Sequence, residues 1–170
     1  QVQFQVPITV TNGSVSQPLS IGVSGDGPGG LLDNTIGVDV DTTYGTYIEV
    51  LAPPAPPPPF GFDARLVTIP GRVSTYPAGL GGGVYADYRG WNSYLQVDTF
   101  KVLLDGSDVE GSTTTISWPA GLGAYGSAWT ILPQGGGWTP VDMIANQSVV
   151  VPAAGIGLTP VSVLIIKTGA

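Results

Sequence analysis

The chain of 170 residues contains no cysteine and no histidine, and only 10% of its residues are charged. The two missing residue types exclude Ser-His and Cys-His nucleophilic catalysis and the usual zinc ligands. A serine or threonine nucleophile acting with Lys101 or Lys167 has no supporting motif, because both lysines stand in strand-like segments. Glu49 and Glu110 are the only glutamates, and their positions beside a proline run and in a polar turn do not favour a glycosidase pair. The sequence therefore predicts a protein that is not an enzyme.

Basic residues are scarce as well. Five lysines and arginines stand against twelve acidic residues, for a net charge of −7, which argues against nucleic acid and anionic membranes as partners. The mean hydropathy is +0.27, yet no apolar run approaches the roughly 20 residues that a membrane helix needs. A chain this apolar must bury surface in a large core or against neighbouring copies. It begins at Gln1 without methionine, which is consistent with removal of a signal peptide and predicts a secreted, extracellular or cell-surface protein.

What the chain has in abundance is glycine, with 26 residues, and proline, with 16. Six of the eight residues from 52 to 59 are proline. Since proline fixes φ and lacks an N–H donor, this segment is predicted to be polyproline II, without ladder hydrogen bonds. Strand-like runs precede it at 47–51 and follow it at 60–69. The segment 52–59 therefore reads as a rigid strap between two strands of one domain.

The rest of the chain carries strand signals. Residues 1–6 alternate between polar and apolar, the period of a strand with one buried face, and similar short runs recur between turn residues to the end of the chain. No window keeps a helical period over ten residues. The sequence predicts a single all-β domain over residues 1–170: a two-sheet antiparallel β-sandwich, Ig-like or jelly-roll, with the polyproline strap on its surface. The expected core residues are Phe4, Val10, Ile21, Val23, Phe62, Leu66, Phe100, Ile116, Trp118, Val163 and Ile165.

Two groups of side chains are candidates for binding. Oxygen ligands from flexible loops suit calcium, and four aspartates crowd one glycine-rich region; a solvated acidic edge is the alternative. These aspartates are Asp26, Asp33, Asp39 and Asp41. Exposed aromatics could form a sugar-binding platform, although aromatics in β-sandwiches more often pack in the core or in subunit interfaces. The aromatic candidates are Tyr85, Tyr88, Trp91, Tyr94, Trp129 and Trp138. Apart from calcium as this candidate, no cofactor is expected.

Two further patterns concern charge and modification. The motif Asp-x-Arg occurs at Asp63 to Arg65 and again at Asp87 to Arg89. In each copy the acid and the base lie on one face of a strand, so a lattice of structural salt bridges is expected, with Asp63 pairing with Arg89 and Arg65 with Asp87. Triplets at 12–14 and 146–148 fit the N-glycosylation acceptor pattern and make glycans candidate partners.

The order of several short motifs resembles a module of secreted bacterial proteins. The matching pieces are Val10-Thr11-Asn12-Gly13, Ile21-Gly22-Val23, the Asp/Gly-rich loop 26–33, the proline run entering Phe62-Asp63-Ala64-Arg65-Leu66, Asp87-Tyr88-Arg89, Thr115-Ile116-Ser117-Trp118 and Val141-Asp142-Met143. Together they are similar to the Ig-like or jelly-roll surface module of type IX-secreted proteins in the Bacteroidota–Ignavibacteria–Chlorobi group. Ile21 stands where that module usually has phenylalanine, and no carboxy-terminal sorting domain follows Ala170. The resemblance implies a β-sandwich on the cell surface, here making up essentially the whole mature protein.

These observations lead to an expected function. A lone surface module without catalytic residues, apolar and with strand-like ends, is expected to be a structural subunit that polymerises with copies of itself into an extracellular filament, tube or surface layer. A monomeric adhesion or carbohydrate-binding module is the alternative. For assembly, residues 1–6 are the expected donor strand, with Val2, Phe4 and Val6 filling a neighbour's groove and Pro7 interrupting the ladder. Donation of residues 161–166 and face-to-face packing are the other modes.

Overall fold

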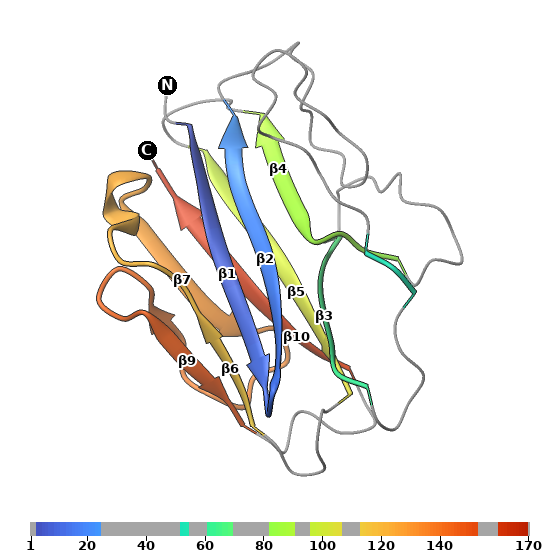
Figure 1. Ribbon diagram of the computed structural model, residues 1–170. Coiled ribbons are helices and arrows are strands. Elements are labelled where there is room, and N and C mark those ends of the chain that lie inside the picture. Colours follow the sequence, from blue (N-terminus) through green and yellow to red (C-terminus); the bar gives the residue numbers. More distant parts are fainter. Residues whose placement is uncertain are drawn as a thin grey trace.

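The computed structural model describes residues 3–24, 52–54, 61–69, 82–90, 96–106, 113–152 and 160–169. This part of the chain forms two five-stranded sheets that pack face to face, so the predicted β-sandwich is confirmed (Figure 1). Its only helical element is the short 3-10 helix η1. The elements in chain order are β1 (Phe4–Asn12), β2 (Val15–Ser24), β3 (Asp63–Val67), β4 (Ala86–Gly90), β5 (Val97–Asp105), β6 (Thr114–Ser117), η1 (Leu122–Ala124), β7 (Ala128–Pro133), β8 (Val141–Asp142), β9 (Ser148–Val151) and β10 (Val161–Thr168).

The strand order is β4-β2-β1-β6-β9 in the first sheet and β3-β5-β10-β7-β8 in the second. All pairs between these strands are antiparallel except β2 with β4, which is parallel. β1 and β2 form a hairpin whose two-residue loop begins at Gly13, with φ 59° in the left-handed region that glycine tolerates. This turn joins two central strands of the first sheet.

Strand β1 runs straight through Pro7, against the expectation that this proline would interrupt the ladder. Pro7 pairs with Ser20, and the Ser20 N–H points away from β1 to the Tyr85 carbonyl. The Pro7–Ser20 pair is thus of the type that exchanges no hydrogen bonds, so the nitrogen of Pro7 faces the opposite side of β1. There β6 pairs with β1 only from Thr9 onward. Proline fits at this position because β6 does not extend beside it, so the ladder does not require the N–H that proline lacks.

Inward-facing side chains of both sheets form one core. Of the residues expected in it, Phe62 is half-buried and packs against the core, and the others are buried. Further buried members come mostly from alternate positions of the same strands; they include Val6, Ile8, Leu19, Val102, Leu104, Trp129 and Ile131. The alternating burial along β1, β5 and β7 shows why a period of two predicts this core from sequence.

On each side of the sandwich a segment passes from one sheet to the other. On one side Val84 exchanges two backbone hydrogen bonds with Leu66 of β3, at 2.8 and 2.9 Å, and the chain then enters β4 beside β2. On the other side β8 pairs with β7 and, after a turn, β9 pairs with β6. The edge strands are β4 and β9 in the first sheet and β3 and β8 in the second.

Only the first residues of the proline strap lie in the described part. Ala52 is buried and donates its N–H to the Gly83 carbonyl at 3.0 Å, whereas Pro53 and Pro54 are exposed. Residues 52–54 belong to no strand. Residues 55–59 lie outside the described residues, as does the strand-like run predicted at 47–51.

The turn between β8 and β9 is held by Trp118, which follows β6. Its indole N–H lies 2.9 Å from the Met143 carbonyl and 2.7 Å from the Asn146 carbonyl, and the side chain is buried. We expect Trp118→Phe to lower the free energy of unfolding by about 1–3 kcal/mol, because it leaves these carbonyls without their donor while most of the ring packing remains. Urea denaturation measures the loss. Trp138→Phe, at a half-buried position, is the control, and equal losses for the two variants would contradict this role of the indole N–H.

Candidate functional site

The structure places Phe4 and Val6, two residues of the expected donor strand, inside their own chain. Phe4 and Val6 are buried in the chain's own core, where they pair with Val23 and Ile21 of β2. Their strand is the central one of the first sheet. In the single chain, the segment that was expected to pair with a neighbour therefore fills the chain's own core. Donating it to a neighbour would leave these core positions empty. Val2 lies outside the described residues.

The expected calcium ligands are four aspartates. Asp26, Asp33, Asp39 and Asp41 all lie outside the described residues. Within the described ranges, no group of three or more acidic side chains is close enough to hold a metal ion.

The aromatic candidates do not form an open platform where the structure describes them. Trp129 is buried in the core, and Tyr88 is buried in a separate small cluster with Ala86. Tyr85 and Trp138 are half-buried and pack against the core. Trp91 and Tyr94 lie outside the described residues.

The first Asp-x-Arg motif forms a buried bidentate ion pair. Arg65 Nε lies 2.6 Å from Asp63 Oδ2, and Arg65 Nη2 lies 2.8 Å from Asp63 Oδ1. Nη2 also donates to the Pro53 carbonyl at 2.7 Å, so the arginine ties the start of the strap to β3. The hydrogen bond to Asp63 raises the pKa of Arg65 in spite of its burial. Burial also raises the pKa of neighbouring Tyr85.

The second motif forms a looser pair. Arg89 Nη2 lies 3.3 Å from Asp87 Oδ2, and both side chains are buried. The Arg89 guanidinium stacks 4.2 Å from the Phe100 ring centre and also donates to the Thr99 carbonyl. Because Arg89 is in β4 and Thr99 in β5, it joins the two sheets. Each ion pair forms within one motif, so the expected pairing of Asp63 with Arg89 and of Arg65 with Asp87 is wrong. The reason is local, because side chains two positions apart on one strand project from the same face and lie next to each other.

A third buried ion pair was not expected from the sequence. Lys167 of β10 and Asp98 of β5 are direct cross-strand partners, and Nζ lies 3.7 Å from Asp98 Oδ2. The alternation of β5 and β10 could have indicated it, since Asp98 shares a face with Phe100, and Lys167 with Val163 and Ile165. Three of the five basic residues of the chain are thus buried in ion pairs.

The outer face of the second sheet is rich in aliphatic side chains. They project from β3, β5, β7 and β10 at the positions that alternate with the core, and we call this surface the aliphatic face. Its members are Val67, Val97, Leu103, Leu132, Leu164 and Ile166. Leu164 lies at its centre, paired with Leu132 on one side and Lys101 on the other. Val97 is 58% exposed and the others are half-buried.

Charges on this face are few and ordered. Lys101 and Asp105 project from β5 on either side of Leu103, each two positions away. On neighbouring β3, the opposite charges of Asp63 and Arg65 cancel within their ion pair, and Asp142 lies on the edge strand β8.

The outer face of the first sheet is different in character. The central strands β1 and β2 present glutamine, proline, threonine and serine there, and β6 adds Thr115 and Ser117. Among the described residues of β1, β2, β6 and β9, none on this face is charged. Val150, on the edge strand β9, is 57% exposed. The two faces of the sandwich therefore differ in chemistry, one aliphatic and one rich in hydroxyl groups.

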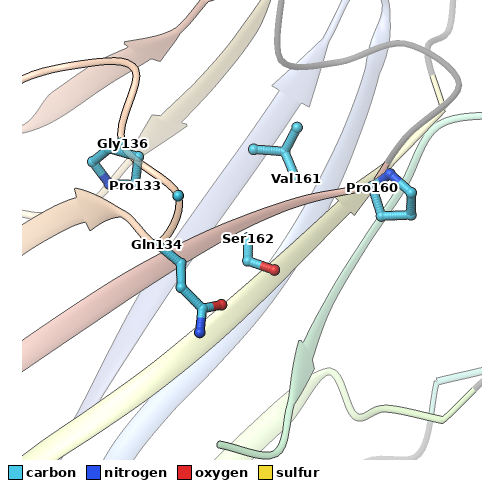
Figure 2. Close-up of a pocket in the computed structure, with 7 residues that line it drawn as sticks. Pro133, Gln134, Gly136, Pro160, Val161 and Ser162 are labelled. Carbon is cyan, nitrogen blue, oxygen red and sulfur yellow. The ribbon is translucent and has the colours of Figure 1, made fainter.

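A shallow depression of about 410 Å³ lies where β7 ends and β10 begins (Figure 2). It is lined by Pro133, Gln134, Gly135, Gly136, Pro160, Val161 and Ser162. The side chains of Gln134 and Ser162 point to the same side in Figure 2. The described lining has amide and hydroxyl groups but neither a charge nor an aromatic ring, so it offers hydrogen bonding without a stacking surface.

The two glycosylation triplets differ in accessibility. Asn12 is fully buried and donates its side-chain N–H to Thr114 Oγ1 at 2.9 Å, so it is not open to modification in the folded chain. Asn146 is exposed, and its side chain donates to the Asp142 carbonyl at 2.9 Å. Of the two acceptor sites, only Asn146 is accessible in the structure.

The described part of the chain contains no helix that is long and apolar enough to cross a membrane. No known protein-family model matches the chain, and searches of curated proteins and of solved structures find no significant match.

Proposed function

We propose that the chain is a structural subunit of an extracellular assembly, a filament, tube or surface layer, in which copies pack through the aliphatic face. The observation that carries this proposal is the set of aliphatic side chains on the outer surface of the second sheet, in a chain with only 10% charged residues. An outward apolar sheet face gains free energy when a second sheet covers it, at a spacing of about 10 Å. A second copy of the chain is the proposed occupant.

The charge pattern of β5 supports a copy as the partner. In the proposed contact, a two-fold axis would lie between the two aliphatic faces, beside Leu103 and at right angles to the strands. It would place Lys101 of each subunit opposite Asp105 of the other. Both side chains lie about 7 Å along the strand from Leu103. The pattern is thus self-complementary in the antiparallel arrangement, whereas parallel stacking would oppose like charges.

Face-to-face packing also suits the place of the amino-terminal strand. Phe4 and Val6 fill their own core, so assembly through the aliphatic face requires no strand to leave its subunit. A two-fold contact closes on itself, and a polymer needs a second contact. The edge strand β9 with exposed Val150 offers one.

Charge exchange on β5 tests the proposed arrangement. We expect Lys101→Asp and Asp105→Lys, made singly, each to raise the dissociation constant of the face-to-face contact about tenfold, because each places like charges opposite one another twice. The double variant should regain most of the affinity. Sedimentation velocity over a concentration series gives the constants. A double variant as weak as the single ones, or single variants without effect, would refute the antiparallel arrangement.

The alternative function is a monomeric adhesion or carbohydrate-binding module. In the described part its best support is the depression at Gln134 and Ser162, which lacks an aromatic platform. Negative-stain microscopy of native material separates the two functions: the structural subunit predicts polymers, and the alternative predicts particles near 17.4 kDa.

A further inference from the structure

Lys167 and Asp98 meet inside the sandwich, close to the end of β10. They are direct cross-strand partners, and their side chains are 3% and 2% exposed. The amine nitrogen Nζ lies 3.7 Å from Asp98 Oδ2, an ion-pair separation longer than a hydrogen bond. A nucleophilic nitrogen and a carboxyl group are thus held side by side, shielded from water.

The surroundings of this pair are aromatic. Lys167 Nζ lies 5.5 Å from the Phe4 ring centre, and Phe4 packs against Tyr125 and Trp129 at ring distances of 5.1 and 5.5 Å. A β-carbon at Gly126 would lie only 3.0 Å from Lys167 Cγ. The lysine stem therefore occupies space that a side chain at Gly126 would fill, and this packing restricts where its amine can lie.

The hydrogen bonds of Asp98 are uneven. Gln96 Nε2 donates to Asp98 Oδ1 at 2.7 Å, whereas Oδ2 accepts no hydrogen bond from the described residues. A donor on Oδ1 polarises the carboxyl carbon and stabilises negative charge that develops on that oxygen. Burial lowers the pKa of Lys167 although Asp98 partly opposes the shift, which favours the neutral, nucleophilic amine.

We propose that Lys167 and Asp98 condense to an intramolecular amide that joins β10 covalently to β5. The Lys167 ammonium first passes a proton to Oδ2 of Asp98, which leaves a neutral amine and a neutral carboxylic acid. Nζ then attacks Cγ of Asp98, forming the C–N bond. Oδ2 departs with two protons from the nitrogen and the acid as one water molecule, while Oδ1 remains as the amide carbonyl oxygen. The step needs no oxidant and no further reactant, and the fixed juxtaposition supplies the proximity that it requires.

The amide would tie the last strand of the sandwich to its neighbour. Pulling on the carboxyl-terminal end would then load a covalent bond instead of the ladder between β5 and β10. The inference concerns a single chain and does not depend on the proposed assembly, so either can fail without the other.

Mass spectrometry of the purified, folded protein tests the proposal. We expect an intact mass lower than the sequence mass by one water molecule. The chain has only two lysines, so trypsin gives a clear result. The unlinked protein yields peptides 90–101 and 102–167, whereas the amide blocks cleavage after Lys167 and joins 90–101 to 102–170. Fragmentation should locate the link at Asp98 and Lys167.

Lys167→Arg is the matched variant, because it keeps the cation but removes the primary amine. Its intact mass should show no water loss. Ring closure at Asp26-Gly27 or Asp105-Gly106 also expels water, but it would persist in this variant and gives no joined peptide. The peptide map of the unsubstituted protein decides the outcome even if the variant fails to fold. Separate peptides ending at Lys101 and Lys167, after days of incubation at neutral pH, would overturn the proposal.

Discussion

Replacing Leu164 by glutamate is expected to convert the assembled protein to monomers of 17.4 kDa. Leu164 lies at the centre of the aliphatic face, on the middle strand of the second sheet. A carboxylate there would be buried in every face-to-face contact and would compete with Asp105 of the other subunit for Lys101, its cross-strand neighbour. The cost of several kcal/mol corresponds to a loss of affinity of a hundredfold or more. Because the position is only half-buried in the single chain, the fold should survive. Size-exclusion chromatography and negative-stain microscopy measure the result.

Thr9→Glu is the matched control for this experiment. Thr9 is likewise half-buried, on the outer side of β1, the middle strand of the first sheet. We expect this variant to assemble normally. If Thr9→Glu abolishes assembly and Leu164→Glu does not, the contact belongs to the hydroxyl-rich face, and the proposed use of the aliphatic face is wrong.

Removing Arg65 is expected to have the largest effect on stability. Arg65→Met should lower the free energy of unfolding by about 3–5 kcal/mol, because it leaves the buried Asp63 carboxylate without its bidentate partner. The cross-strand neighbour of Asp63 is Asp105, so the variant also brings two uncompensated carboxylates together. Urea denaturation of monomeric protein gives the free energy.

Two companion variants separate the ion pair from simple packing. Arg65→Lys keeps the charge but cannot form the two parallel hydrogen bonds, so it should lose part of the stability. The double variant Asp63→Asn with Arg65→Met should recover part of the loss of the single variant, since it removes the stranded charge. A double variant that is less stable than Arg65→Met alone would show that the carboxylate is not the source of the cost.

Much of the fold can be predicted from local sequence patterns. The period of two in 97–105 and 161–168 places Phe100, Val163 and Ile165 inward, as the structure has them, because the two faces of a strand are fixed by its geometry. It does not place Asp98 and Lys167, which are charged and yet buried. The hairpin at Gly13 follows from the need for a residue that accepts positive φ. Glycine and proline at this density break helices, and the recurring short alternating runs then predict an all-β domain.

The sequence does not predict which residues from distant segments contact one another. The sequence indicates that Asp63, Arg65, Asp87 and Arg89 form ion pairs, but it does not say which acid meets which base. The structure places β3 in the second sheet and β4 in the first, and pairing within each motif results. The structure likewise places residues 4–6 in the core of their own chain, whereas their alternation fits an exchanged strand and a central core strand equally well.

The sequence by itself thus determines the strands, their inward faces and the scarcity of charge, because these depend on neighbours one or two residues away. Only the tertiary structure decides that Lys167 meets Asp98, that Arg65 reaches the Pro53 carbonyl, and that the aliphatic side chains of β5, β7 and β10 gather on one surface. Each of these contacts joins residues from different strands or segments. Strand order and register bring them together, and these are set by the packing of the whole core.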